Sequence, residues 1–91
     1  MSNDWGIPDW LEQKVRKRDT RCVYCHKIFN NSSKDRATWE HVDNNSKNIT
    51  ESNIALCCAS CNSSKSAKSL EAWLKSDYCK NRGITKSSIS I

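Results

Sequence analysis

The sequence has little of what holds most small domains together. Only 36% of its 91 residues are hydrophobic, so a hydrophobic core is marginal at this size. No apolar run approaches the roughly 20 residues of a membrane span, and Met1 to Gly6 lack the basic and apolar regions of a signal peptide. We therefore expect one small domain in the reducing cytoplasm, stabilised by something besides burial.

Six cysteines are the obvious additional support. Disulfides need an oxidising compartment, so we interpret these cysteines as reduced thiolates on a metal. Four of them form two Cys-x2-Cys turns, Cys22 with Cys25 and Cys58 with Cys61. Each turn places two sulfurs at a spacing that suits tetrahedral Zn²⁺, and two turns leave no open coordination position. The pattern predicts one structural zinc ion, whose binding contributes on the order of 10 kcal/mol to folding.

Other ligands remain open at this point. Cys57 and His26 each stand beside a predicted ligand and could replace it. If residues 54–57 form a strand, Cys57 packs instead as a small hydrophobic residue. Two thioredoxin-like redox pairs would need a βαβ pattern, which surrounds neither turn. Cys79 has no partner nearby in the sequence and is interpreted as a spare thiol.

The N-terminal region predicts a helix. Residues 1–7 are expected to form a loose arm, and Pro8 suits a first helical turn. Asp9 with Glu12 three residues later resembles a capping box, so a helix is expected over 8–18. Its apolar stripe is expected to contain Trp10, Leu11 and Val15.

The rest of the chain predicts two strands followed by helices. The expected elements are a strand over 37–42, a polar loop over 43–52, a strand over 54–57, a helix over 58–67, and a further helix that Ser69 caps and Gly83 ends. Leu70, Trp73 and Leu74 share a face of this last helix. We expect one domain over 8–79 and a frayed tail over 80–91.

The charge is basic and unevenly distributed. Fifteen Lys and Arg against ten Asp and Glu give a net charge of +5, which favours a polyanionic partner. One basic cluster contains Lys14, Arg16, Lys17, Arg18 and Arg21, and a second contains Lys65 and Lys68. Each cluster is a candidate grip on DNA phosphates, and a solvated helix face explains the charge pattern equally well.

A resemblance appears when the motifs are taken in order. They are Cys22-x2-Cys25, Trp39-Glu40-His41, Asn53-Ile54-Ala55-Leu56, and Cys58-x2-Cys61-Asn62-x2-Lys65. This order resembles the HNH nuclease family, in its four-cysteine zinc branch, over roughly Arg21 to Lys68. The resemblance implies an α+β fold: a small zinc-stapled ββα-metal domain with flanking helices.

The resemblance also implies roles. His41 matches the general base that activates a water, and Asn53 matches the residue whose amide braces the loop between the strands. Glu40 and Asn62 match the ligands of a catalytic divalent cation, Mg²⁺ or Mn²⁺. This chain departs from the usual pattern with Glu where Asp is common, with Asn62 in place of the last His, and without the common loop glycines.

The residue chemistry is coherent without the family. Phosphodiester hydrolysis needs an activated water and a cation on the developing negative charge. Carboxylate and amide oxygens favour Mg²⁺ or Mn²⁺ over zinc. Glu40 and His41 would face opposite sides of a regular strand, so one site can use both only if the strand twists, bulges or ends there. Asp43 could orient the imidazole of His41.

We therefore expect an endonuclease that nicks DNA or cuts it with low specificity. The main rival is a non-catalytic zinc module that binds nucleic acid. A RING-like interaction domain would need eight interleaved ligands, which the sequence lacks. DNA is the expected partner, with no membrane and no small-molecule cofactor, and monomer and dimer both remain open.

Overall fold

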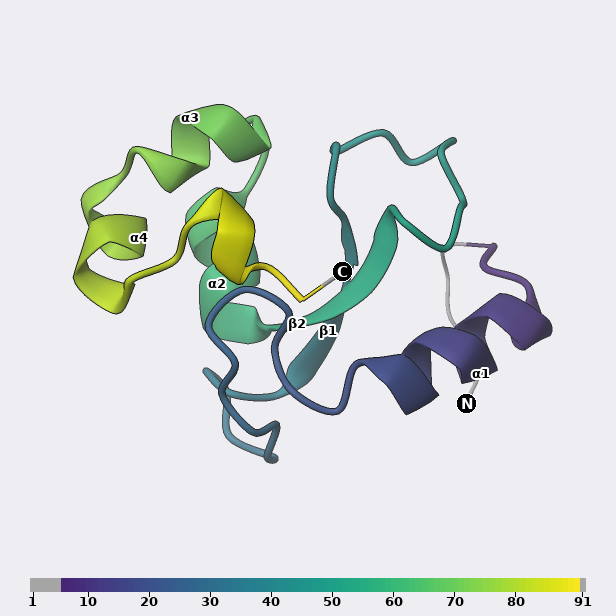
Figure 1. Cartoon of the computed structure of the whole chain (residues 1–91). Helices are drawn as coiled ribbons and strands as arrows, with labels where there is room; N and C mark the ends of the chain where they lie inside the picture. Colours follow the sequence, from purple (N-terminus) through teal and green to yellow (C-terminus); the bar gives the residue numbers. More distant parts are fainter. Residues whose placement is uncertain (1–5, 91) are drawn as a thin grey trace.

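A two-stranded sheet lies between one N-terminal helix and a group of short C-terminal helices (Figure 1). The computed structural model describes residues 6–90, so Trp5 and most of the expected arm lie outside the described residues. The elements are α1 (Asp9–Arg18), β1 (Ala37–His41), β2 (Ile54–Cys58), α2 (Ala59–Lys65), α3 (Leu70–Leu74), α4 (Asp77–Arg82) and a 3₁₀ turn (Lys86–Ser88). The α+β expectation is confirmed.

The sheet is an antiparallel hairpin. Its register pairs Ala37 with Cys58 at one end and His41 with Ile54 at the other. Every residue of β2 is buried, whereas β1 changes from exposed at Ala37 to buried at His41. The hairpin therefore leaves only the last part of β1 inside the protein, next to the loop that joins the strands.

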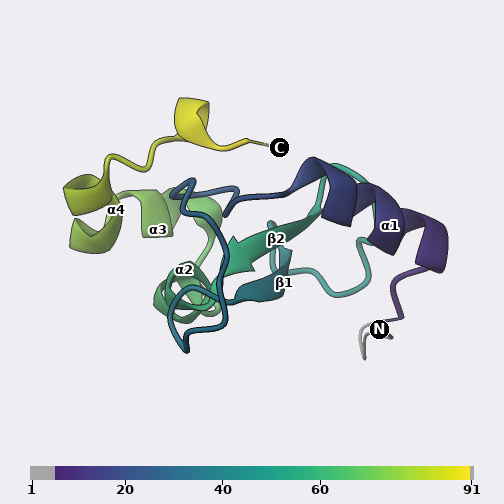
Figure 2. The same ribbon diagram turned by 90° about the horizontal axis from the view of Figure 1, so that it is seen from below.

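Two cores flank the sheet, because alternate residues of β2 face opposite sides. Ile54 and Leu56 pack with Ile7, Leu11 and Val15 on the α1 side. The other core contains the cysteine knuckles, the alternate β2 residues and the C-terminal helices: Cys22, Val23, Tyr24, Ala55, Cys57, Cys58, Cys61, Trp73, Cys79 and Ile84. Figure 2 shows the same division, with α1 at one end and α2, α3 and α4 at the other.

Helix α1 differs from its expected details. Its buried stripe is Ile7, Leu11 and Val15, spaced four residues apart, and Trp10 is 63% exposed. The prediction of Trp10 as a core residue is wrong, because it lies about 100° around the helix from Leu11. The expected capping box is also wrong: Pro8 occupies the N-cap position without a side-chain hydrogen bond, and Asp9 is already helical.

The C-terminal helix is split in two. Ser69 caps α3 as expected, its side chain accepting from the Ala72 N–H. A second serine, Ser76, accepts from the Cys79 N–H and starts α4. Gly83 ends α4 with a φ of 66°, a left-handed conformation that glycine adopts without strain. One predicted helix is therefore two, because a serine in the middle offers its side chain to the backbone.

The residues that follow α4 are ordered against the rest of the fold. Ile84 is buried, and the Ser90 N–H donates to the Val23 carbonyl at 3.0 Å. The predicted fraying is therefore wrong for this part of the tail, and the expected tail boundary at residue 80 falls inside α4. In the described part of the chain, no helix is long and apolar enough to cross a membrane.

Candidate metal centre and nuclease site

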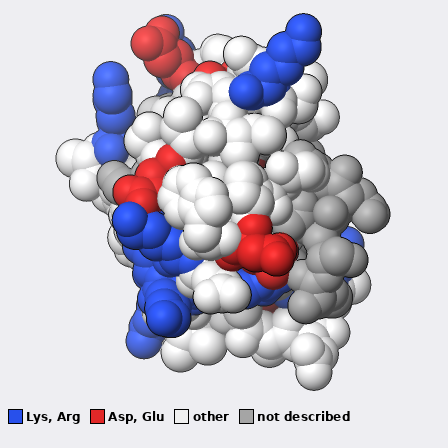
Figure 3. Space-filling view, turned by 90° about the vertical axis from the view of Figure 1, so that its right-hand side faces the viewer, with Lys and Arg blue, Asp and Glu red and all other residues white. Residues whose placement is uncertain are grey.

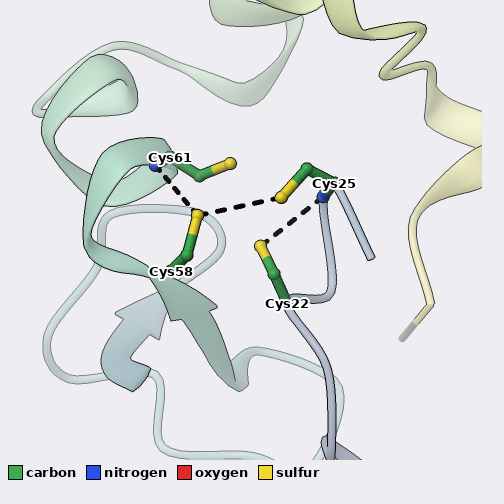
Figure 4. Close-up of side chains that lie close together, drawn as sticks. All are labelled: Cys22, Cys25, Cys58 and Cys61. Carbon is green, nitrogen blue, oxygen red and sulfur yellow. Dashed lines mark hydrogen bonds between the residues drawn. The ribbon is translucent and has the colours of Figure 1, made fainter. Parts of the chain in front are cut away.

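The two cysteine turns meet and form one four-sulfur cluster (Figure 4). The Sγ atoms of Cys22, Cys25, Cys58 and Cys61 all lie within 4.8 Å of one another. Those of Cys25 and Cys58, from different turns, are 3.8 Å apart. A tetrahedral zinc ion with Zn–S bonds of about 2.3 Å separates its sulfurs by about 3.8 Å. The four cysteines therefore fit a structural zinc ion.

Each knuckle has the hydrogen bonds of a metal-binding turn. The Cys25 N–H points at Cys22 Sγ, and the Cys61 N–H points at Cys58 Sγ, at 3.5 and 3.4 Å (Figure 4). The hydroxyl of Tyr78, from α4, donates to Cys61 Sγ at 3.2 Å. Such donors stabilise thiolates, which are the form that binds a metal.

The remaining candidates for this centre are not ligands. Cys57 is fully buried and lies outside the cluster, as expected for a small hydrophobic residue. Burial raises the pKa of the Cys57 thiol, so it stays protonated. By contrast, hydrogen bonds with Cys22 and Cys61 lower the pKa of Cys58. His26 is exposed at a φ of 64° and also lies outside the cluster.

Cys79 has a structural place that the sequence did not indicate. It is fully buried in the core next to the knuckles. Burial raises the pKa of its thiol. The interpretation of Cys79 as a spare thiol is therefore incomplete, because its side chain fills part of the core.

A hollow of about 650 Å³ lies beside the knuckles rather than beside His41. Cys25 and Cys58 reach it, and so do three basic residues, Lys27, Lys34 and Arg82. Asp35 also lines the hollow and is paired with Lys27. Four thiolates around Zn²⁺ would carry a net charge of −2, which Lys34 and Arg82 offset. We therefore treat the hollow as part of the zinc centre and not as a separate anion site.

Glu40 lies in a buried network on the α2 side of β1. Its Oε2 accepts a hydrogen bond from the Tyr24 hydroxyl at 2.9 Å and lies 3.3 Å from Lys65 Nζ. Burial, with the nearby Glu40 charge, raises the pKa of Tyr24, so the phenol stays a donor. One carboxylate oxygen of Glu40 is therefore engaged by two donors.

Lys65 is 0% exposed, which corrects its assignment to the DNA phosphates. Its ammonium is paired with Glu40 and donates to Asn44 Oδ1 at 2.7 Å. A buried ammonium needs such partners, because an unpaired charge in the interior is strongly destabilising. Lys68, the other residue of that predicted basic cluster, is exposed and donates to the Ser64 carbonyl.

Asn62 lies in α2 and is bonded to β1. Its Nδ2 donates to Thr38 Oγ1 at 3.0 Å and to the Trp39 carbonyl at 3.2 Å. Because a carbonyl only accepts, the bond to Trp39 fixes which end of the amide is the nitrogen. Thr38 and Glu40 share one face of β1, so Asn62 and Glu40 are both on the α2 side of the sheet.

His41 is the last residue of β1 and is 8% exposed. The β1–β2 pairing continues through His41 without a bulge, so Glu40 and His41 leave the strand on opposite faces. The strand ends immediately after His41, where the Asn44 N–H donates to the His41 carbonyl at 2.9 Å. Asp43 lies past the strand end, and its carboxylate accepts from the Asn45 backbone and the Asn48 side chain.

Asn53 spans the loop between the strands. Its Oδ1 accepts from the Asp43 N–H at 2.9 Å, and its Nδ2 donates to the Asn48 carbonyl at 2.9 Å. The Val42 N–H also donates to the Asn53 carbonyl. The buried Asn53, at the end of the loop, is thereby bonded to the residues that directly follow His41 at its start.

The basic cluster at α1 separates into two kinds of residue. Arg18 is structural: it donates to both oxygens of Asp19 and to the Glu51 and Ile54 carbonyls. These bonds engage its guanidinium within the fold. Lys14 pairs with Glu51. Arg16 pairs with Glu12 and lies over the Trp39 ring.

Two residues of this cluster, Lys17 and Arg21, are exposed and have no ion pair among the described residues. Figure 3, which views the molecule from the α1 side, shows acidic side chains among the basic ones. The basic surface here is therefore smaller than the sequence indicated.

No family model, curated protein or solved structure matches this chain. Its own residues and contacts carry the functional assignment.

Two residues that contact Glu40 or Lys65 were not identified from the sequence. Tyr24 lies inside the first knuckle, between the cysteines, and Asn44 is one of several polar residues in the loop after His41. Nothing in the local pattern distinguishes Asn44 from Asn45. Tyr24 did offer a sequence signal, because a large aromatic residue is unusual within a tight metal-binding turn.

Proposed function

We propose that this protein is a zinc-stapled HNH-type nuclease that hydrolyses DNA with a second, catalytic divalent cation. The observation that carries the proposal is the loop brace at Asn53, directly after His41, within a hairpin that runs into α2. A loop over 42–53 that serves only as a connection does not need a buried amide tying its two ends. A general base at its start does, because the base must be held in place.

His41 acts as the general base in this proposal. It takes a proton from a water whose oxygen attacks the scissile phosphorus, while the P–O bond to the leaving sugar oxygen breaks. Asn53 holds the loop that follows His41. Since β1 ends at His41, a phosphate placed at that end of the strand is reachable from both of its faces. The opposite orientations of Glu40 and His41 are then compatible with a single phosphate between them.

The donor set on the α2 side fits a hard cation. Glu40 has one carboxylate oxygen beyond the one held by Lys65 and Tyr24, and Asn62 has its amide oxygen. These two oxygens would hold Mg²⁺ or Mn²⁺, with water and phosphate completing the shell. When bound, the cation would stabilise the negative charge that develops on the phosphate.

A non-catalytic module that binds nucleic acid is the second candidate. One observation favours it: the Glu40 charge is already neutralised by a buried lysine, so this carboxylate attracts a dication less than a free one would. Both candidates share the zinc centre and the exposed Lys17, Arg21 and Lys68. They differ in whether the protein binds a catalytic cation and hydrolyses the DNA.

A plasmid-nicking assay separates the two. Zinc-loaded protein is incubated with supercoiled plasmid in Mg²⁺, Mn²⁺ or EDTA, and DNA binding is measured in parallel in EDTA. The nuclease proposal expects nicking with a divalent cation and none in EDTA. Binding without nicking in Mg²⁺, Mn²⁺, Co²⁺ or Ni²⁺ would leave the binding module as the function.

A further inference from the structure

Lys65 is buried and contacts both parts of the proposed site, the candidate metal ligand Glu40 and the turn after His41. Its ammonium contacts the Glu40 carboxylate at 3.3 Å and the Asn44 side-chain oxygen at 2.7 Å, and it has no exposed surface. We propose that Lys65 is a positioning residue, which fixes the candidate metal ligand Glu40 relative to the turn after the candidate base His41. Its catalytic meaning rests on the proposed nuclease function.

The link to His41 runs through Asn44. The Asn44 N–H donates to the His41 carbonyl, its Oδ1 accepts from Lys65, and its Nδ2 donates to the Lys68 carbonyl after α2. Asn44 has a φ of 62°, a left-handed conformation that asparagine adopts more readily than most residues. The turn is thus bonded to the end of α2 at two points, and one of them is the Lys65 ammonium.

The link to Glu40 is direct. Lys65 and the Tyr24 hydroxyl both hold Oε2, so the carboxylate cannot rotate freely and its other oxygen keeps one direction. In the buried interior such charge-assisted bonds are strong and geometrically specific. A single ammonium therefore controls the direction of a metal-binding oxygen and the place of the base. A lysine that only neutralised Glu40 would not need Asn44.

The most useful variant is Asn44→Gly. Glycine adopts the positive φ without strain, so the backbone of the turn is kept while the side-chain bonds to Lys65 and to the Lys68 carbonyl are lost. Asn44→Asp also loses the bond to the Lys68 carbonyl, so the comparison of the two variants isolates the Lys65 contact. Asn44→Asp retains an oxygen acceptor for Lys65 and serves as the rescue. Lys65→Met removes both contacts, and because it leaves Glu40 buried without a cation it can prevent folding. Lys80→Met, at an exposed position on α4, controls for the loss of a lysine.

The first readout is independent of activity. The chain has two histidines, so NMR can follow the His41 ring with the exposed His26 ring as an internal reference. In Asn44→Gly the His41 ring resonances should shift and those of His26 should not. In Asn44→Asp and Lys80→Met both rings should match wild type. A folded, zinc-loaded Asn44→Gly with unmoved His41 resonances would overturn the proposal.

The second readout is the nicking reaction. Asn44→Gly should lower kcat roughly 10–100-fold, the usual effect of removing a partner that orients a ligand. KM and DNA affinity in EDTA should stay unchanged, and Asn44→Asp should recover most of the rate. A fall in DNA affinity that accounts for the lost rate would instead overturn the positioning role. If wild type never nicks, the nuclease proposal fails, while the His41 resonances still decide whether Lys65 positions the turn.

Discussion

The Sγ atoms of Cys25 and Cys58 lie 3.8 Å apart, although 33 positions separate them in the chain. Because of this contact, the loop after α1 lies against the junction of β2 and α2. Tyr24 in the first knuckle and Lys65 in α2 then both reach Glu40. The four-cysteine cluster therefore lies where the elements that carry the proposed nuclease residues meet.

Zinc should be present at one ion per chain, measured by elemental analysis. Cys58→Ser should remove it and unfold the protein, because binding contributes on the order of 10 kcal/mol to folding. Cys57→Ala is the matched control, since it changes the neighbouring buried cysteine, which lies outside the cluster. It should keep zinc and lose only about 1 kcal/mol of stability. Well-folded wild type without zinc would contradict the assignment.

Metal removal should expose all six cysteines together. In the zinc-loaded protein, iodoacetamide at pH 8 should label none of them: four are bound to zinc, and Cys57 and Cys79 are buried thiols whose pKa values are raised. A strong chelator should unfold the chain and allow six labels, counted by mass spectrometry. Labelling of four cysteines with the far-UV circular dichroism unchanged would instead mean that the fold survives without the metal.

His41→Ala should reduce plasmid nicking about 10²–10⁴-fold, the usual contribution of a general base. Zinc content and DNA affinity in EDTA should be unchanged, since the base acts only during the reaction. The control is His26→Asn, which removes the other imidazole and tolerates the positive φ at that position. It should nick at the wild-type rate. Equal nicking by His41→Ala and wild type would exclude His41 as the base.

The basic residues near α1 should divide by role. Lys17→Gln and Arg21→Gln should weaken DNA binding equally for all sequences. Each should also flatten the salt dependence by about one unit of log–log slope, measured by titration at several salt concentrations. An unchanged slope would make these two residues part of a solvated face.

Arg18→Gln should act on stability instead. It removes charged hydrogen bonds to the buried Asp19 and to two backbone carbonyls, at a cost of about 2–4 kcal/mol. Thermal unfolding should show this loss, with no change in the salt dependence of DNA binding. Asp19 also accepts from the Leu56 N–H, so Asp19→Asn is expected to be destabilising as well.

Local patterns predicted much of the framework. The spacing of the four cysteines predicted the cluster, because a Cys-x2-Cys turn fixes two sulfurs within a few residues. Strand and helix periodicity predicted α1, β1, β2 and α2 to within a residue or two at most ends, and Ser69 and Gly83 marked helix ends through their side-chain and backbone preferences. These features depend on neighbours in the chain, so the sequence alone determined them.

Only the tertiary structure decided which basic residues are bonded within the fold. Lys65 and Arg18 look like solvated basic residues in sequence, yet the ammonium of one meets Glu40 and the guanidinium of the other meets Asp19 and the β2 backbone. A charged side chain is stable inside a protein only where specific partners converge on it. Most of those partners come from elements that are distant in the chain, so no local pattern in the sequence indicates them.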